Sequence, residues 1–400
     1  MKYILILADG ASDLPIDELG GKTPLQSAST PNIDALAGRS RCGRLITIPP
    51  GMPPGSEIAN LSVMGYDVKE VFEGRGVLEA ASMGVDIAGD EMAMRCNLIC
   101  MEDGKIKNHS AGHIETEEAR ILIEELQKRL NSDRVKFFPG VSYRHLLVVK
   151  GGNKSIDCTP PHNVPGTPFI DVMVNAITDE GRETAELINN LIVSSQEILG
   201  KHPVNLKRIR KGQDPANSVW PWSPGYRPQM KTFRELYGKS GAVISAVDLL
   251  YGIGAYAGLK AIHVEGSTGL YNTNYEGKAK AAVDALKEVD FVYLHIEASD
   301  EAGHEGDFEL KKKTIEYLDQ RVVKYIVEQT AAMDEDVAIA ILPDHPTPCK
   351  LRTHTRDPVP FLIYHPGYKS DDVTRWDEDS VLDGGFGLMH ARDFMKTFLA

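Results

Sequence analysis

Residues 3–10 of the chain read YILILADG, a short apolar run that ends in a carboxylate and a glycine. Two later stretches also place Asp and His after an apolar run: residues 291–304 read FVYLHIEASDEAGH, and residues 337–346 read VAIAILPDHP. Continuous apolar runs of this length are typical of strands that are buried on both faces of a parallel sheet. The carboxylates and imidazoles that follow would lie at buried strand ends, where charged groups need a cation or a partner. The three stretches therefore predict one sheet with a polar site at its edge.

Strand and helix patterns alternate along the second half of the chain. Further strands are expected at residues 241–247, 259–264 and 360–364, and helices at residues 277–289 and 308–333. This alternation favours a mostly parallel sheet with helices on both faces, so the expected fold class is α/β. The first strand shares the pattern but lies far away in the sequence, which indicates a discontinuous domain with an insert.

The middle of the chain has a different pattern, which we interpret as that insert. Strands are expected at residues 94–100 and 144–149, an amphipathic helix at 116–130 and a second helix at 181–199. Residues 211–228, rich in Pro and Trp, are expected to form a hinge or linker that also touches the core. The expected domains are a discontinuous core of residues 1–86 and 225–400 and an α+β cap of residues 87–224.

Composition narrows the class of protein. The chain has 400 residues, 42% of them apolar, and a formal net charge of −13. Such an acidic chain is a poor partner for nucleic acid. The five cysteines are scattered without a paired zinc-type spacing, which is typical of reduced thiols in a cytosol. No apolar run reaches the ~18 residues of a membrane span, and no secretory leader is recognisable. We expect a cytoplasmic protein that binds a small phosphorylated metabolite, with no nucleic-acid or membrane partner and with its oligomeric state open.

Six side chains of metal-binding type follow the apolar runs: Asp9, Asp300, His304, Asp344, His345 and His354. Asp300 and His304 are four residues apart, a spacing that places both on one face of a helical turn. Carboxylates and imidazoles without thiolates suit Mn, Zn, Fe or Co rather than a structural zinc site. Six such ligands suffice for two divalent ions, which can stabilise the attacking and the leaving oxygen of an in-line displacement.

A candidate nucleophile lies on the bend at residues 53–57, PPGSE. A metal ion lowers the pKa of a hydroxyl and so makes a serine such as Ser56 nucleophilic near neutral pH. The combination predicts phosphoryl transfer. His263 and His295 lie inside predicted strands, and we expect both to be packed or hydrogen-bonded rather than metal-bound. Cys349 is expected to be packed, because a soft thiolate is out of place among hard carboxylates.

The motifs resemble those of a known family. The chain is similar to the alkaline phosphatase superfamily and, more closely and nearly end to end, to the archaeal-type branch of cofactor-independent phosphoglycerate mutases. The stretches that carry the closer resemblance are 8–10 (ADG), 20–25 (GGKTPL), 30–34 (TPNID), 74–76 (GRG) and 110–113 (SAGH). The resemblance implies an alkaline-phosphatase-like three-layer core with an inserted cap.

The resemblance also implies roles for single residues. One ion would be held by Asp300, His304 and His354, and the other by Asp9, Asp344, His345 and the hydroxyl of Ser56. The ions would be Mn or Zn, with Mg or Co as alternatives, and Ser56 would accept the phosphoryl group. His113 resembles the histidine that contacts the transferred phosphate. Arg144 is expected to be an anion clamp, and Lys239, just before the strand at 241–247, is a further candidate substrate contact.

Several functions remain open at this point. The leading one interconverts 3-phosphoglycerate and 2-phosphoglycerate through a phosphoserine. The stretches at residues 108–113 and 241–249 are also similar to a proposed homoserine kinase branch, which would use ATP and homoserine at the same site. No Walker-type or kinase-type glycine loop is present to indicate a nucleotide. A metal-dependent phosphatase is a third alternative, and the intact set of ligands and nucleophile argues against a fourth, a metal-bound structural protein.

Overall fold

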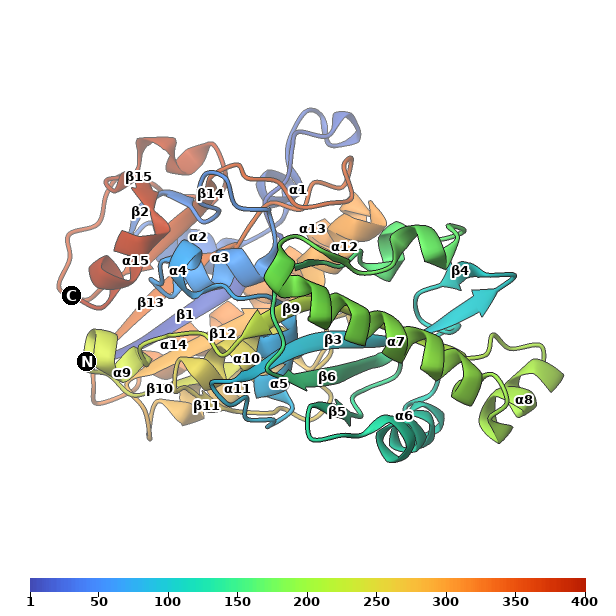
Figure 1. Cartoon of the computed structure of the whole chain (residues 1–400). Helices are drawn as coiled ribbons and strands as arrows, with labels where there is room; N and C mark the ends of the chain where they lie inside the picture. Colours follow the sequence, from blue (N-terminus) through green and yellow to red (C-terminus); the bar gives the residue numbers. More distant parts are fainter. The chain divides into compact units, whose positions relative to one another are not determined.

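The computed structural model describes all residues from 1 to 400, which form two compact units. We name Met1–Phe72 with Gln229–Ala400 the core unit, and Glu73–Pro228 the inserted unit. Figure 1 shows the whole chain with its elements labelled. No helix combines the length and the apolar character that a membrane crossing requires.

The core unit contains an eight-stranded sheet in the order β11-β10-β12-β1-β13-β14-β2-β15. Seven of these strands run in one direction, and β14 alone runs antiparallel to both of its neighbours. The strand bounds are β1 Lys2–Ala8, β2 Arg41–Ile46, β10 Gly241–Ile244, β11 Lys260–Ala261, β12 Phe291–Ile296, β13 Val337–Leu342, β14 Val359–Tyr364 and β15 Gly387–His390. The predicted α/β class with a mostly parallel sheet is confirmed, while β2 and β15 were not predicted.

Helices cover the sheet because the strand residues are apolar on both faces. Ile4 and Ile6 of β1 belong to a buried cluster with α11, α13 and α14, while Tyr3, on the opposite face, packs its ring edge against Phe398 of α15. The expected helix at 308–333 is interrupted by a π-helical segment and ends at Thr330. The helices are α1 Pro24–Ser27, α2 Pro31–Ala37, α3 Ser56–Val63, α4 Val68–Val71, α9 Phe233–Tyr237, α10 Asp248–Tyr256, α11 Tyr275–Ala285, α12 Ala298–Glu305, α13 Phe308–Tyr317, the π segment Leu318–Val323, α14 Lys324–Thr330 and α15 Ala391–Phe398, with 3-10 turns at Asp17–Leu19 and Ser380–Asp383.

The inserted unit is built on an antiparallel sheet. Its strands are β3 Glu91–Glu102, β4 Lys105–Asn108, β5 Val135–Phe138, β6 Arg144–Lys150 and β9 Ser218–Tyr226, with a separate small pair β7 Ile156–Asp157 and β8 Asn175–Ala176. Its helices are α5 Arg75–Ser82, α6 Thr116–Leu130, α7 Arg182–Leu199 and α8 Pro203–Arg210, with 3-10 turns at Pro161–Asn163, Phe169–Val172 and Asp179–Gly181. Apolar residues of α6 and α7 share one buried cluster with the sheet.

The stretch expected as a linker at 211–228 is largely a strand, so that prediction was wrong. β9 pairs antiparallel with β3, for example Trp220 opposite Asn97. Because β9 pairs with β3 alone, it is an edge strand, and an edge tolerates prolines that cannot donate to a ladder. The two tryptophans are buried against the sheet rather than exposed on a tether.

The inserted unit also begins earlier than residue 87. Helix α5 packs directly on its sheet: a Cβ on Gly76 would lie 2.8 Å from the Cα of Met94, so the two backbones touch. The backbone N–H of Arg75 donates to the hydroxyl of Ser223 at 3.0 Å, which ties the start of α5 to β9. The boundary therefore falls at Glu73.

A buried lysine fixes the loops that follow two of the central strands. Lys311 of α13 is fully buried and donates to the carbonyls of Ser12 and Thr347, at 3.0 and 2.9 Å, and to the carboxylate of Asp13 at 2.8 Å. Ser12 and Asp13 lie after β1, and Thr347 lies after β13. The ammonium group therefore holds these two loops together.

Replacing this lysine should destabilise the core unit strongly. We expect Lys311→Met to lower the free energy of unfolding by about 3–5 kcal/mol, because it leaves the buried Asp13 carboxylate without its cation. Urea denaturation followed by circular dichroism measures the change. Lys312→Met on the same helix is the matched control and should cost well under 1 kcal/mol, roughly as a surface change does. Equal midpoints for the two variants would contradict this role of Lys311.

Candidate metal centre

The six predicted metal-binding side chains meet at one edge of the core sheet. Strands β12, β1 and β13 are adjacent and parallel, with Tyr3 opposite Phe291 and Ile4 opposite Ile339, so their carboxyl ends coincide. The candidate ligands lie just beyond these ends: Asp9 after β1, Asp300 and His304 on α12 after β12, Asp344 and His345 after β13, and His354 in the loop before β14.

The first group of possible ligands consists of Asp300, His304 and His354. The Nε2 atoms of the two imidazoles are 2.9 Å apart, and they lie 3.3 and 3.4 Å from the two carboxylate oxygens of Asp300. His304 Nδ1 faces the carbonyl of Arg352 at 3.0 Å, so its proton belongs on Nδ1 and leaves Nε2 free to bind a metal. The three side chains thus direct lone pairs toward one point.

The second set of possible ligands centres on Asp9. Asp9 groups with Asp300 and His345, and separately with His295 and Asp344. His345 Nε2 lies 3.8 Å from Asp9 Oδ1 and 3.4 Å from Asp344 Oδ2. Asp9 and Asp344 are nearly or wholly inaccessible to solvent. His295, which was expected to be packed or hydrogen-bonded rather than metal-bound, thus lies among the possible ligands.

The electrostatics of the site are those of an anion-rich pocket. Burial, together with the charges of Asp344 and Asp300, raises the pKa of Asp9 well above its usual range. Burial also works to raise the pKa of Asp300, but hydrogen bonds with His304 and His354 outweigh it and hold that pKa well below its usual value. The hydrogen bond with Asp300 raises the pKa of His304 to about 9. Carboxylates this close repel each other unless protons or cations intervene.

The donor set fits divalent cations. Asp9 Oδ1 is buried and has no hydrogen-bond partner, which is costly for a carboxylate oxygen unless an ion takes that place. All donors are oxygen or imidazole nitrogen, a set that suits divalent cations. Gly10 makes room for the arrangement: its φ is +63°, and a Cβ there would lie 2.7 Å from both the Cα and the Oδ1 of Asp300.

The predicted nucleophile, Ser56, lies at the same edge of the core sheet as the possible metal ligands. Ser56 is the first residue of α3, half-buried, and its Oγ lies 3.1 Å from His345 Nε2. Asn60, one turn later, donates to the carbonyl of Ser56 at 2.8 Å and to Asp344 Oδ2 at 3.0 Å, and it accepts a hydrogen bond from the Tyr293 hydroxyl. Asn60 and Tyr293 were not singled out from the sequence. Asn60 lies four residues after Ser56 on α3, and Tyr293 lies on β12. These positions become informative only once α3 and β12 are known to pack together.

The structure does not bring Lys239 together with the other predicted residues of the core unit. Lys239 precedes β10, whose Gly241 pairs with Phe291, which in turn pairs with Tyr3. Its ammonium group sits 4.6 Å from the ring centroid of Tyr3. Lys239 therefore lies at the amino ends of the parallel strands, at the edge of the sheet opposite to Asp9.

His113 and Arg144 belong to the inserted unit, where both contact Tyr143. The His113 ring is 6.0 Å and the Arg144 guanidinium 5.5 Å from the Tyr143 ring centroid. Ala111, Gly112 and His113 all have positive φ, a left-handed turn that is uncommon for residues with a side chain and is found most often at functional positions. The structure thus brings these two predicted residues together within their own unit.

Further basic groups gather around the same aromatic rings. His109 packs against Tyr143, His162 packs against Trp222, and the buried Arg95 lies 4.5 Å over the Trp222 ring. Burial and then neighbouring positive charges lower the pKa values of His109 and His162. We name His109, His113, Arg144, His162 and Arg95 the histidine–arginine cluster. Arg144 is exposed and adds positive charge to the cluster, whereas Arg95 is paired with Glu79 at 3.2 Å. Positive charge at this place suits an anionic ligand.

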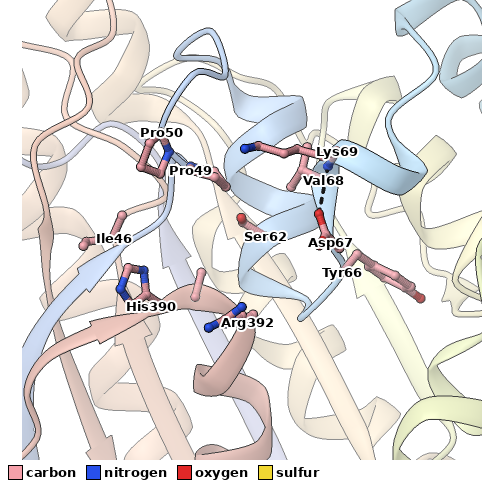
Figure 2. A pocket seen from close by; sticks show the side chains of 11 residues that line it. Ile46, Pro49, Pro50, Ser62, Tyr66, Asp67, Val68, Lys69, His390 and Arg392 are labelled. Carbon is pink, nitrogen blue, oxygen red and sulfur yellow. Dashed lines mark hydrogen bonds between the residues drawn. The ribbon is translucent and has the colours of Figure 1, made fainter.

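A separate pocket of about 280 Å³ in the core unit contains none of these residues (Figure 2). It lies beside the start of α15, and its lining includes Ser62, Lys69, His390 and Arg392. The backbone N–H of Lys69 donates to the carboxylate of Asp67 at 3.1 Å, so this acidic side chain caps α4. None of the three groups of side chains that could hold a metal ion includes a residue of this pocket.

Known proteins resemble the chain along its whole length. A sequence model of the family described as 2,3-bisphosphoglycerate-independent phosphoglycerate mutase matches residues 37–205. A Methanosarcina acetivorans protein of that name is 52% identical over 399 residues, which cover 99% of this chain and 98% of the relative. A Methanosarcina mazei protein of the same name is 50% identical over 402 residues, which cover 100% of both chains.

Solved structures agree with these relatives. A Pyrococcus horikoshii protein superposes with a TM-score of 0.85 and 33% identity, covering 100% of this chain and 96% of its own. The cofactor-independent phosphoglycerate mutase of Thermoplasma acidophilum superposes with a TM-score of 0.71 and 29% identity, covering 100% and 99%. The family resemblance inferred from the motifs is confirmed, and the chain belongs to the family of 2,3-bisphosphoglycerate-independent phosphoglycerate mutases.

Proposed function

We propose that the protein interconverts 3-phosphoglycerate and 2-phosphoglycerate by metal-assisted phosphoryl transfer through a phosphoserine at Ser56. The observation that carries the proposal is the place of the Ser56 hydroxyl, 3.1 Å from His345 and beside two ligand groups that share an edge of the sheet. The names of the Methanosarcina relatives support the substrate. The homoserine kinase alternative finds no support among the relatives and structures described above.

In this proposal Asp300, His304 and His354 hold one divalent ion, and Asp9, Asp344, His345 and Ser56 hold the other. The ions, Mn or Zn with Mg or Co as alternatives, would supply positive charge that lowers the pKa of the hydroxyl and stabilises the transferring phosphoryl group. Thr347 helps to fix the ligands, because its hydroxyl donates to Asp300 and lies 3.3 Å from His345 Nδ1.

The chain's own residues carry the transfer. Ser56 Oγ gives up its proton and attacks phosphorus, the bond from phosphorus to the glycerate oxygen breaks, and the glycerate oxygen takes up a proton. The position of Ser56 at the first turn of α3 favours negative charge on Oγ. The other hydroxyl of glycerate then gives up its proton and attacks phosphorus, the bond from phosphorus to Ser56 Oγ breaks, and Oγ takes up a proton. Asn60 holds the serine backbone in place through both steps by its hydrogen bonds.

We further propose that the inserted unit is a substrate-binding cap, in which the histidine–arginine cluster binds the anionic groups of phosphoglycerate. Arg144 is exposed and free to form a bidentate contact with a carboxylate or phosphate. Arg95 is buried, and its Nε has no hydrogen-bond partner, although it lies 3.2 Å from Glu79 Oε1. The exposed guanidinium of Arg144 supports this role, because in an acidic chain an anion must be bound by local positive charge.

Removing the Ser56 hydroxyl should abolish turnover. We expect Ser56→Ala to lose several orders of magnitude in kcat, as removal of a covalent nucleophile does, while the fold is kept. The assay follows 3-phosphoglycerate by phosphorus NMR and the phosphoserine by mass spectrometry. Ser62→Ala on the same helix is the matched control and should retain turnover. A Ser56→Ala variant with near-normal activity would exclude the serine mechanism, and formation of phosphohomoserine from ATP and homoserine by the wild type would favour the kinase.

Metal removal should inactivate the enzyme, and metal affinity should depend on pH. The pKa of His304 is raised to about 9 by Asp300, so below that pH a proton must leave before the ring can bind an ion. Apparent Mn affinity of the chelator-stripped protein should therefore rise about tenfold per pH unit from roughly pH 7 to pH 9, and then level off. Titration against a competing chelator measures it. An affinity independent of pH, or a slope unchanged in His304→Ala, would contradict the ligand assignment.

Loss of the exposed arginine should weaken substrate binding. We expect Arg144→Ala to raise KM for 3-phosphoglycerate by about tenfold or more, since a hydrogen bond to a charged group contributes roughly 1.5–3 kcal/mol. Steady-state kinetics give the value. Arg129→Ala, an exposed arginine of α6 in the same unit, is the control and should leave KM unchanged. Equal KM values for the two variants would remove Arg144 from the substrate site.

A further inference from the structure

His295 is a buried histidine that points into the metal centre without belonging to the ligand set proposed above. It is the penultimate residue of β12, and its side chain is wholly inaccessible to solvent. Its two ring nitrogens face different groups: Nε2 lies 3.0 Å from Asp9 Oδ2, and Nδ1 lies 3.1 Å from Glu297 Oε1. A histidine that merely filled space in the core would not need a carboxylate at each nitrogen.

The neighbours of Nδ1 decide where the ring proton sits. Glu297 is buried, pairs with the fully buried Lys278, and accepts the backbone N–H of Ala246, so it is an anion that can only accept. The Ser245 hydroxyl, 3.1 Å from Nδ1, gives its own proton to Glu297 at 2.9 Å and is left to accept. Because both neighbours accept, Nδ1 carries the proton and Nε2 carries the lone pair.

That lone pair has no partner within the protein. His295 Nε2 and Asp9 Oδ1 are both buried without a hydrogen-bond partner, since the close approach of Nε2 to Asp9 Oδ2 is not a hydrogen bond. The donor atoms of Asp9, His295 and Asp344 all lie within 4.8 Å of one another. Two ligands about 2.1 Å from one ion and at a right angle to each other are ~3.0 Å apart, which matches Nε2 and Asp9 Oδ2.

We infer that His295 Nε2 is a direct ligand of a divalent cation that Asp9 and Asp344 hold, and that Glu297, Ser245 and Lys278 keep the ring in the tautomer this requires. The inference rests on the metal dependence in the proposed function and adds a ligand to it. Lys278 and Glu297 neutralise each other, so the support brings no net charge next to the ion. A carboxylate that orients a ligating imidazole in this way raises the basicity of the ligand.

Two substitutions at this position separate ligation from packing. In His295→Asn the side-chain amide reaches the place of Nδ1, so it can still bond Glu297 and Ser245 but has no atom at the place of Nε2. In His295→Gln the amide reaches the place of Nε2 and offers an oxygen there, but it loses the contact of Nδ1. If His295 Nε2 binds the metal, the His295→Asn variant must bind metal more weakly than the His295→Gln variant. If His295 acts only through Nδ1, the His295→Gln variant must bind metal more weakly.

The measurement is titration of chelator-stripped protein with Co²⁺, followed by visible absorption and by metal content per chain, without any substrate. We expect His295→Asn to lose one class of bound Co²⁺ or to weaken it by at least about 100-fold, and His295→Gln to weaken it less and to change the absorption band. His365→Asn is the matched control, because His365 is also buried with an unpartnered Nε2 but follows the antiparallel β14, at the other edge of the sheet.

The inference would be overturned if His295→Asn bound Co²⁺ with the affinity and absorption of the wild type. It would also be overturned if His295→Gln bound Co²⁺ more weakly than His295→Asn. If thermal unfolding shows that the variants do not fold, the wild type still decides: in protein labelled with ¹⁵N-histidine, the Nε2 resonance of His295 must shift on addition of Zn²⁺, and an unshifted resonance overturns the proposal. Turnover of 3-phosphoglycerate is assayed separately. A protein that binds metal through His295 but shows no mutase activity would refute the proposed function and leave this inference intact.

Discussion

Three carboxylates buried within a few ångströms of each other are the constraint on which this site depends. Asp9, Asp300 and Asp344 are each less than a tenth exposed, and the ion pairs they make are with imidazoles. Burial and then the charges of Asp344 and Asp300 raise the pKa of Asp9, and one oxygen of Asp9 has no hydrogen-bond partner. Divalent cations relieve this repulsion, so the geometry of the site and its proposed chemistry have the same physical origin.

The fold provides what such a site needs: rigid strand ends in register and loops that cannot spread apart. The parallel register of β12, β1 and β13 sets the spacing of the ligands. Lys311 binds the loops after β1 and β13 to each other, and Gly10 lets the chain pass against Asp300 where any side chain would collide. The network of Asn60 and Tyr293 attaches the nucleophile's helix to the same frame.

The two units carry different chemistry. The core unit holds carboxylates and imidazoles suited to cations, and the inserted unit holds the histidine–arginine cluster suited to anions. In the proposed function the core unit stabilises the transferring phosphoryl group, and the inserted unit binds anionic groups of the substrate. The insertion lies between Phe72 and Gln229, outside the strands of the core sheet, so it leaves that sheet uninterrupted.

The sequence by itself determined the α/β class, the interrupted core and the six ligand candidates, because a polar residue directly after a buried strand is a local feature that needs no partner to be recognised. It also pointed to Ser56, His113 and Arg144. Only the tertiary structure decided what depends on contacts between distant segments. The prolines of β9 indicate a linker, yet these residues form a strand by pairing with β3. Lys239 precedes β10, and because β10 runs parallel to β12, Lys239 lies at the edge of the sheet opposite to the possible metal ligands. In the sequence His295 resembles a core residue, because the carboxylates that face its two ring nitrogens cannot be recognised there. Glu297 lies just after the same strand, and Asp9 follows β1, nearly three hundred residues away.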